Sequence, residues 1–462
     1  MHHSARAWIA KLAFVAALTF LGACASIAPG HVTRRAPVEF VVIAPASFQP
    51  TLDRYLKYRS KNVALEFVAL ENVLAGSPGV DDPEKVKRYL YDLYTNRGLR
   101  YALLAGDADV FPVRYMCLDR VTKEAFDYAF YPSDLYYADL AKRDGSFDDW
   151  NATKTDFHAS YFGEVRGENN KNDPINYDAV DYIPEVAVGR WPVSNIVELD
   201  RVITKTIAYE NAVFTKNTAT RRAVFVTVQG WVDCRAWIDT LAASLPADWT
   251  SSLLYEGKTL PSAANVTTEL TKGAGLVVHA GHGHDHGWEG SLQTGDIVNF
   301  NNAEAPPIVL SAGCSTARFA TLPPYESYMD TNGAAHKGTN HGEVFTIPPP
   351  APACYATGDY NKTGFGEQLL KGGSNGAVAY FGCNTGSQPA GLTLVEGFLD
   401  KLKIADPNRT LRLGDLYTHS IHYFFDKQQL QSLKPSPSWY PPSIFFQGMK
   451  FMLFGDPMLQ IH

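Results

Sequence analysis

Short apolar segments that alternate with amphipathic helical segments restrict the fold of this chain more than any other feature of the sequence. Residues 40–44 (FVVIA) form an uninterrupted apolar run, which is typical of a strand buried on both faces of a sheet. Residues 83–96 begin with a proline and place Val86, Leu90 and Leu93 on one helical face. Because alternating strands and helices with short connections favour a parallel sheet covered by helices, the sequence predicts an α/β fold.

The predicted elements form two successive sets. The first set has strands at residues 40–44, 64–68, 101–105 and 185–190 and helices at residues 51–61, 83–96 and 194–209. The second set has strands at residues 223–228, near 253, and at 276–278, 308–310, 376–381 and 451–454, with helices near residues 237–245, 262–271, 392–402 and 411–424. We therefore expect two adjacent parallel-sheet α/β subdomains, residues 38–215 and residues 216–462.

Two long segments interrupt this pattern. Residues 127–181 are aromatic and rich in Asp and Asn, and oxygen-rich loops of this kind can hold calcium, although the spacing matches no EF-hand. A solvated connecting loop is the alternative, so a structural calcium ion is left open. Residues 321–362 are rich in Pro and Gly, and loops of this length are usually functional lids or disordered.

The N-terminus has the layout of a secretory signal. Arg6 and Lys11 precede an apolar run of about 10 residues, which is too short for the roughly 20 residues of a membrane-spanning helix. The run ends in Leu-Gly-Ala-Cys and resembles the lipobox of bacterial lipoproteins, in which Cys24 would be lipidated. We expect a signal peptide at residues 1–23, a tether at residues 24–37 and a lipid anchor in the bacterial cell envelope, with simple secretion as the alternative. Ala25 favours the outer membrane if the organism is Gram-negative.

Composition excludes several classes of protein. Hydrophobic residues make up 45% of the chain and charged residues 19%, which is ordinary globular usage and argues against disorder. Cleavage after residue 23 would leave 39 Lys and Arg against 48 Asp and Glu, a net charge of −9. An acidic balance without basic clusters argues against a nucleic-acid partner. Five cysteines follow Cys24, and this odd number leaves at least one thiol unpaired or paired outside the chain.

The candidate chemistry lies where two predicted strands end. Residues 276–278 lead into a segment with four histidines, and residues 308–310 lead into Ser-Ala-Gly-Cys, in which the cysteine is Cys314. Ligands and catalytic groups gather beyond the carboxyl ends of the strands in open α/β sheets. Four histidines within eight residues suggest a zinc hydrolase. The offsets, however, match neither His-x-His-x-Asp-His nor His-Glu-x-x-His.

A thiol hydrolase is the alternative that these residues favour. Such an enzyme needs an imidazole beside its nucleophilic sulfur, and backbone N–H groups directed at the developing oxyanion. His282 lies between two glycines, and the N–H groups of Gly283 and Cys314 could form the oxyanion hole. We therefore predict that His282 and Cys314 share one site.

The same residues carry a resemblance to a known family. Gly281-His282-Gly283-x4-Trp288, followed 32 residues after His282 by Cys314, resembles the gingipain-type cysteine peptidases, relatives of the caspase-like fold. Further matching segments are YALLAGDADVFP (residues 101–112), YPSDLYYADL (131–140), PEVAVGRWPV (184–193), FGEQLL (365–370), GGSNGAVAYFG (372–382) and LFGDPML (453–459). The resemblance covers residues 38–462 and implies a three-layer α/β/α architecture.

The resemblance also implies roles for individual residues. Cys314 is the expected nucleophile, His282 the general base and later acid, and Glu185 the acidic residue that orients the imidazole. Gly283 and Cys314 form the expected oxyanion hole. The resemblance further implies a substrate contact for Trp288, with a buried aromatic as the alternative. Glu198 is the candidate acidic group for a preference for basic residues.

The function expected from the sequence is that of a lipid-anchored or secreted cysteine endopeptidase. It would hydrolyse proteins or peptides through a thioester acyl-enzyme on Cys314, with no cofactor required for the chemistry. The N-terminal lipid would attach the enzyme to a membrane. Two other classes stay open: a catalytically silent surface-binding module with the same fold, and a zinc hydrolase that uses the histidine cluster.

Overall fold

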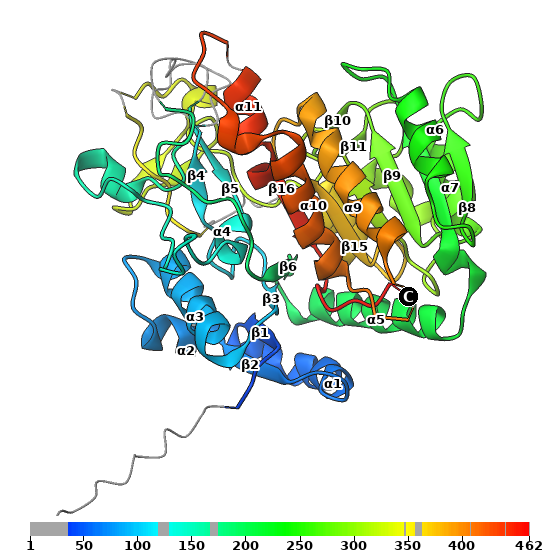
Figure 1. Ribbon diagram of the computed structural model, residues 1–462, viewed down its shortest axis with the longest axis horizontal. Coiled ribbons are helices and arrows are strands. Elements are labelled where there is room, and N and C mark those ends of the chain that lie inside the picture. Colours follow the sequence, from blue (N-terminus) through cyan, green and yellow to red (C-terminus); the bar gives the residue numbers. More distant parts are fainter. Residues whose placement is uncertain are drawn as a thin grey trace, which may run out of the picture. The chain divides into compact units, whose positions relative to one another are not determined.

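The computed structural model describes most of the chain after the predicted tether. The described residues are 36–118, 129–166, 174–345, 348–355, 363–406, 408–438 and 440–461. The chain divides into Met1–Ala36 and one compact unit, Pro37–His462, which is the unit described below (Figure 1). The predicted signal peptide and the predicted lipidation site Cys24 lie outside the described residues.

A ten-stranded sheet forms the centre of this unit. In spatial order the strands are β2 (Leu65–Ala69), β1 (Phe40–Ala44), β3 (Tyr101–Ala105), β6 (Ala187–Trp191), β16 (Phe451–Phe454), β15 (Ala379–Cys383), β12 (Ile308–Ser311), β9 (Leu276–Ala280), β7 (Arg222–Thr227) and β8 (Thr250–Leu254). Every neighbouring pair is parallel except β15 and β16, which are antiparallel. The predicted α/β fold with a mainly parallel sheet is confirmed.

The sheet order separates the two predicted sets of strands. The four strands before residue 215 lie on one side, and the six later strands lie on the other. The halves meet where β16 returns to β6, with Phe454 paired to Arg190. A Cβ atom at Gly189 would lie 2.3 Å from the carbonyl oxygen of Gly455, so this approach requires a glycine. The two sets therefore build one continuous sheet.

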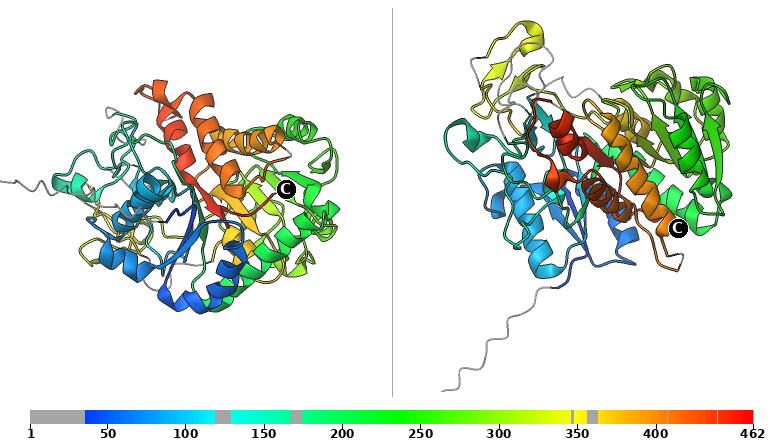
Figure 2. Two further views of the ribbon diagram at one scale, coloured as in Figure 1. Left: turned by 60° about the horizontal axis from the view of Figure 1, so that its bottom comes forward. Right: turned by 45° about the horizontal axis from the view of Figure 1, so that its top comes forward.

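Helices cover both faces of the sheet and complete the three layers (Figure 2). One apolar core contains buried side chains of α3 (Asp82–Arg97), α6 (Arg235–Ala243), α9 (Leu392–Ile404) and α10 (Leu413–Lys427), and also of α2 (Leu70–Gly76), α4 (Leu135–Ala138) and α11 (Tyr440–Gln447). The opposite core contains those of α1 (Gln49–Arg59), α5 (Ile196–Phe214), α7 (Ala263–Thr271) and α8 (Phe365–Lys371). None of the helices in the described ranges is long and apolar enough to cross a membrane.

Local sequence signals set the bounds of the helices. Asp81 caps α3 by accepting the backbone N–H of Glu84, and Gly98, at φ +82°, ends it. Within the described ranges, three short antiparallel strand pairs lie in the connections between the main elements. They are β4 (Tyr115–Cys117) with β5 (Phe130–Pro132), β10 (Gly283–His284) with β11 (Gly287–Trp288), and β13 (Tyr328–Met329) with β14 (Ala335–His336). The last hairpin lies inside the predicted loop 321–362, which thus has regular structure in its described part.

Candidate active site

Four segments converge at one edge of the sheet. Because β7, β9, β12 and β15 are mutually parallel neighbours in the sheet, the segments that follow them lie beyond the same edge. These segments, together with the start of α9, line a cavity of about 50 Å³ that opens to solvent. Its lining residues are Gly230, Trp231, Val232, Cys234, Gly281, His282, Ala312, Cys314, Ser387, Gln388, Pro389 and Leu392. The structure therefore brings the predicted residues His282 and Cys314 together.

The loop after β9 positions His282. The backbone N–H of His282 donates to the carbonyl oxygen of Gln229, 2.8 Å away in the loop after β7. Gly281 has φ +131°, and a Cβ atom there would lie 2.5 Å from Val228 Cγ2. A glycine before His282 is therefore required both by its backbone conformation and by its contact with the neighbouring loop.

Cys314 lies in a tight turn after β12 that contacts the loop after β15. Its sulfur accepts the backbone N–H of Ser387 at 3.3 Å, and its thiol donates to the carbonyl oxygen of Ser387 at 3.6 Å. Ser315 has φ +54°, a conformation that side chains rarely adopt, and its N–H donates to Thr385 at 2.7 Å. The turn thus holds a half-buried thiol at the cavity, with one N–H donor directed at the sulfur.

The predicted oxyanion hole lies beside this turn. A Cβ atom at Gly283 would be 2.6 Å from Thr316 Cγ2 and 3.1 Å from the carbonyl oxygen of Cys314, so the two backbone segments touch. In the described part of the chain, the N–H of Cys314 has no acceptor. An N–H group without an acceptor beside the nucleophile is what oxyanion stabilisation requires.

Trp288 does not line the cavity. Its side chain is only 1% exposed, and its ring stacks on His279 with a centroid separation of 4.4 Å. The ring also packs edge-on against Phe365. The predicted substrate contact of Trp288 is therefore not observed, because the β10–β11 hairpin turns the indole into the core.

His279 is a second imidazole near the site but differs from His282. Its ring is fully buried, its Nδ1 lies 2.9 Å from Ser311 Oγ, and burial lowers its pKa to about 3. A Cβ atom at Gly313 would be 2.9 Å from its Cε1 atom. His279 thus packs as a neutral ring against Gly313, in the turn that holds Cys314.

The two acidic residues taken from the resemblance lie elsewhere. Glu185 Oε2 accepts the N–H groups of Leu140 (2.6 Å) and Ala141 (3.0 Å), and burial raises its pKa. Glu185 precedes β6, and four strand spacings, roughly 19 Å, separate β6 from β9. These contacts give no support to the orienting role expected for Glu185.

Glu198 is also absent from the cavity wall. Its carboxylate accepts the N–H of Ser194 at 2.9 Å, at the start of α5, and lies 3.7 Å from Lys371 Nζ. The predicted acidic group for basic substrates therefore belongs to a helix N-terminus on the opposite face from α9.

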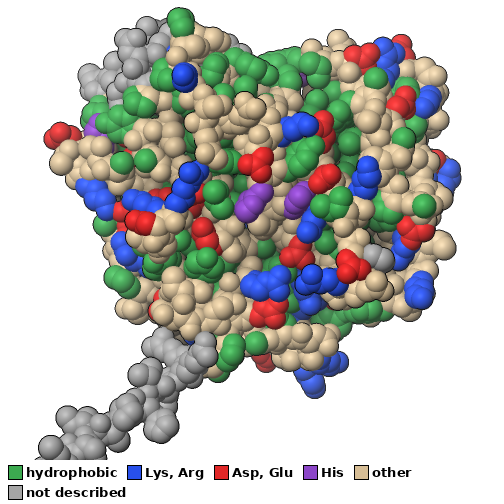
Figure 3. Space-filling model, in the orientation of Figure 1, with side chains coloured by type: hydrophobic (Ala, Val, Ile, Leu, Met, Phe, Trp, Pro, Cys, Tyr) green, Lys and Arg blue, Asp and Glu red, His purple; other side chains and the backbone are tan. Residues whose placement is uncertain are grey.

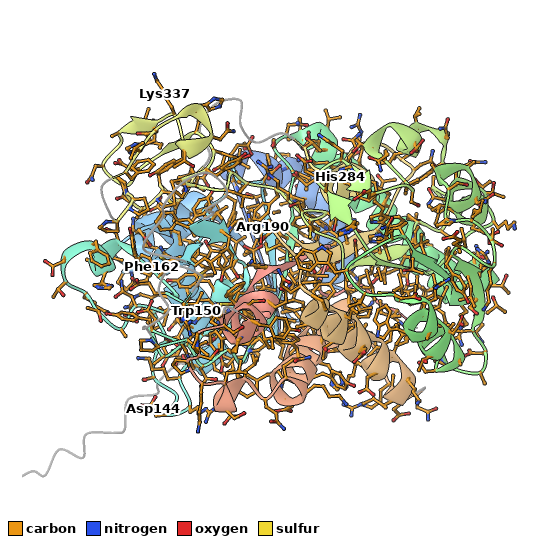
Figure 4. The ribbon with its side chains drawn as sticks, turned by 90° about the horizontal axis from the view of Figure 1, so that it is seen from above. Asp144, Trp150, Phe162, Arg190, His284 and Lys337 are labelled. Carbon is orange, nitrogen blue, oxygen red and sulfur yellow. The ribbon has the colours of Figure 1, made fainter. Side chains whose placement is uncertain are left out.

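The histidine cluster does not form a metal site. His279 is buried and His282 reaches the cavity, whereas His284 and His286 lie on the hairpin, where Figure 4 labels His284. The rings of His284 and His286 are 5.9 Å apart. Across the described ranges, no group of three or more His, Cys, Asp or Glu side chains could hold a metal ion. Calcium binding by the segment 127–181 stays a prediction, because residues 119–128 and 167–173 lie outside these ranges.

Other thiols differ from Cys314 in their surroundings. Cys234, Cys314, Cys354 and Cys383 are free. Burial raises the pKa values of Cys354 and Cys383 to about 12 and also raises that of Cys234. Cys314 is the half-exposed thiol that shares a cavity with an imidazole. A raised pKa leaves the other thiols protonated and unreactive near neutral pH.

Sequence reasoning missed two walls of the cavity. Residues 230–234 follow β7, and residues 387–392 follow β15. Both segments follow predicted strands, which is the signal that could have identified them. This signal was insufficient because the order of the strands in the sheet cannot be read from the sequence.

A half-exposed thiol and an imidazole line one small cavity, and the N–H of Cys314 has no acceptor in the described part of the chain. These are the groups of a thiol-dependent hydrolase. The comparison with protein families identifies this hydrolase further. The profile of Peptidase family C25 matches residues 33–462, so the chain belongs to this family and is a cysteine-type peptidase. The predicted resemblance to the gingipains is thereby confirmed.

Solved structures agree on the fold. The chain is similar to the Arg-specific cysteine proteinase gingipain R, with 15% identity, a TM-score of 0.59 and coverage of 92% of this chain and 78% of that one. It is also similar to a complex of the pro- and mature domains of RgpB from Porphyromonas gingivalis, with 15% identity, a TM-score of 0.59 and coverage of 91% and 79%. No curated protein sequence matches the chain. At 15% identity, these two similarities establish the fold of the chain, which is caspase-like.

Proposed function

We propose that this cysteine peptidase is an endopeptidase that cleaves proteins or peptides with a dyad of Cys314 and His282. The observation that carries the proposal is the shared cavity: the two side chains come from neighbouring parallel strands and line the same small space. No Asp, Glu, Lys or Arg lines that space. The proposal assigns the chemistry to Cys314 and His282 alone.

The proposed chemistry proceeds in two stages. His282 takes the thiol proton while the sulfur of Cys314 attacks the peptide carbonyl carbon, and the N–H groups of Gly283 and Cys314 stabilise the resulting oxyanion. Collapse of this intermediate breaks the C–N bond, His282 gives its proton to the leaving amine, and a thioester remains on Cys314. Water then attacks the thioester with His282 again as base, which releases the acid and restores the thiol.

Cleavage of a diverse peptide library under mild reductant tests the proposal. We expect the native protein to cleave, with product ends read by mass spectrometry, and the Cys314→Ala variant to be inactive. Cys354→Ala is the matched control, because Cys354 is also half-buried but lies outside the cavity. Equal cleavage by the Cys314→Ala variant would assign the activity to another group.

The N-terminus is the basis of a second proposal, on location. A lipid on Cys24 would hold the catalytic unit at the bacterial envelope through the tether of residues 24–37. The support is the Leu-Gly-Ala-Cys sequence after a short apolar run. In cells, Cys24→Ala should move the protein from the membrane fraction to the soluble fraction, and an unchanged distribution would rule out the anchor.

A further inference from the structure

We propose that Gln447 is a positioning residue of this peptidase and holds a backbone N–H donor against the sulfur of Cys314. This inference rests on the proposed role of Cys314 as the nucleophile. Gln447 is the last residue of α11 and does not line the Cys314 cavity. It acts through the sulfur loop, residues 384–388, which follows β15.

The sulfur loop contacts the nucleophile through the backbone of Ser387. The N–H of Ser387 donates to Cys314 Sγ at 3.3 Å, and its carbonyl oxygen accepts the thiol at 3.6 Å. The carbonyl oxygen loses its bond when the thiol proton leaves, whereas the N–H keeps its acceptor. Because a hydrogen bond to the charged form of a group favours that form, the N–H of Ser387 stabilises the attacking thiolate.

Gln447 binds the peptide group that joins Ser387 to Gln388. Its Oε1 accepts the N–H of Gln388 at 3.2 Å. This N–H belongs to the same planar peptide group as the carbonyl oxygen of Ser387, so the bond fixes the orientation of both. The amide nitrogen of Gln447 makes only a weak contact, with Cys383 Sγ at 3.9 Å. The bond to Gln388 therefore links α11 to the nucleophile.

The side chains of Ser387 and Gln388 do not hold this end of the sulfur loop. Ser387 Oγ and Gln388 Oε1 are buried and have no hydrogen-bond partner in the part of the chain that the structure describes. The other end of the loop is bound separately, because the N–H of Asn384 donates to the carbonyl oxygen of Lys450 at 2.9 Å. Gln447 thus fixes the end of the loop that contacts the sulfur.

The burial of Gln447 also supports this role. Gln447 is fully buried and follows two buried aromatic residues of α11, Phe445 and Phe446. Removing an amide from water is unfavourable unless hydrogen bonds compensate it, whereas an apolar side chain of similar size needs no partner. The compensating bond of Gln447 is the one to the sulfur loop, so the buried amide is satisfied only while the loop keeps its position.

The rate at which iodoacetamide alkylates Cys314 tests the inference, with peptide mapping by mass spectrometry as the readout. Gln447→Leu removes the acceptor and keeps an apolar side chain of similar size. At neutral pH we expect this variant to be alkylated about tenfold more slowly than the native protein, because a hydrogen bond to the thiolate is weakened. At alkaline pH, where the thiol is ionised in both proteins, the two rates should converge.

Ser443→Ala is the matched control for this experiment. Ser443 is also buried on α11, and its hydroxyl group has no partner within the described ranges. Its variant should be alkylated at the native rate. If Gln447→Leu fails to fold, Gln447→Asn replaces it, because it keeps a buried amide but is one methylene group shorter. The shorter side chain withdraws the acceptor from Gln388, so the same slowing is expected.

Three outcomes would overturn the inference. The first is native-rate alkylation at neutral pH in a folded Gln447 variant. The second is equal slowing at every pH, which would mean that the sulfur has become less accessible and not less ionised. The third is the same slowing in Ser443→Ala. Alkylation needs no substrate, so the test is separate from that of the proposed function, which native-rate peptide cleavage by Cys314→Ala would overturn whatever the alkylation rates.

Discussion

Two cavities of this peptidase contrast in charge and size. The Cys314 cavity is small and contains no Asp, Glu, Lys or Arg. The cavity that contains Glu185 has about 850 Å³ and gathers four acidic side chains, four basic side chains and two histidines. Figure 3 shows charged and histidine side chains together on the face formed by α9 and α10. The cavity with the most charge is therefore not the cavity of the proposed dyad.

The two cavities also differ in what their side chains do. In the Cys314 cavity, glycine backbone contacts and hydrogen bonds between loops place a thiol beside an imidazole. In the larger cavity, carboxylates bind neighbouring backbone and cations, as Glu185 does with Leu140 and Ala141. Substitutions in the Cys314 cavity should therefore reduce activity more than stability. Substitutions in the larger cavity should reduce stability more than activity.

The largest expected effect is the loss of activity in Cys314→Ala. Without the sulfur no thioester can form, so cleavage should fall to the background of the assay. Cys383→Ala, which removes a fully buried thiol outside the cavity, should keep catalysis per folded molecule. Comparable losses of cleavage in folded Cys314→Ala and folded Cys383→Ala would contradict the special role of the Cys314 cavity.

His282→Ala should have the next largest effect. General base catalysis typically contributes about 10² to 10⁴ in rate, so kcat/KM should fall by that factor. His284→Ala is the control, because its ring lies on the hairpin next to His282 but outside the cavity. An equal loss of kcat/KM in His284→Ala would assign the general base to the hairpin instead of to His282.

The buried ring of His279 should affect stability rather than chemistry. Its folded pKa of about 3 lies below the unfolded value of 6.5, so the unfolded state binds the proton first. Stability should therefore fall as the pH decreases from 6.5 toward 3, by at most about 1.4 kcal/mol per pH unit. Denaturant unfolding of His279→Phe should show a shallower pH dependence, and an unchanged slope would contradict the assignment.

Glu185→Gln should have the smallest effect on activity. The substitution weakens two hydrogen bonds to Leu140 and Ala141, which should cost about 1 kcal/mol of stability. The kcat/KM value should stay within about threefold of the native value, because the residue lies far from the dyad. Glu39→Gln, in the same cavity, is the control. A hundredfold loss with a shifted pH–rate profile would restore the orienting role of Glu185.

Much of the fold could be predicted because most central strands of the sheet are apolar on both faces. Residues 40–44, 101–105 and 276–278 all lie in strands of the large sheet. The proline at the start of residues 83–96 indicated the beginning of α3 within one residue. The helix predicted at residues 194–209 extends to Phe214, since Ala212 still packs against the core.

The placement of the candidate site could be predicted where reactive side chains and glycines occur together in the sequence. His282, Gly283 and Cys314 carry their own signal, because close backbone approach requires the glycines around them. Glu185 was assigned by resemblance alone, and only the sheet order shows that β16, β15 and β12 separate it from the histidine strand. The burial of Trp288 depends on the turn of a two-residue hairpin, which hydrophobic periodicity does not reveal.

Trapping the acyl-enzyme in a single turnover tests the central claim most directly. Native protein in excess over an activated peptide ester is quenched in acid within milliseconds to seconds and mapped by mass spectrometry. The account predicts a transient mass increase equal to the acyl portion on the peptide that contains Cys314, and slower acylation in His282→Ala. An acyl group on another residue, or ester turnover at the native rate in Cys314→Ala, would contradict it.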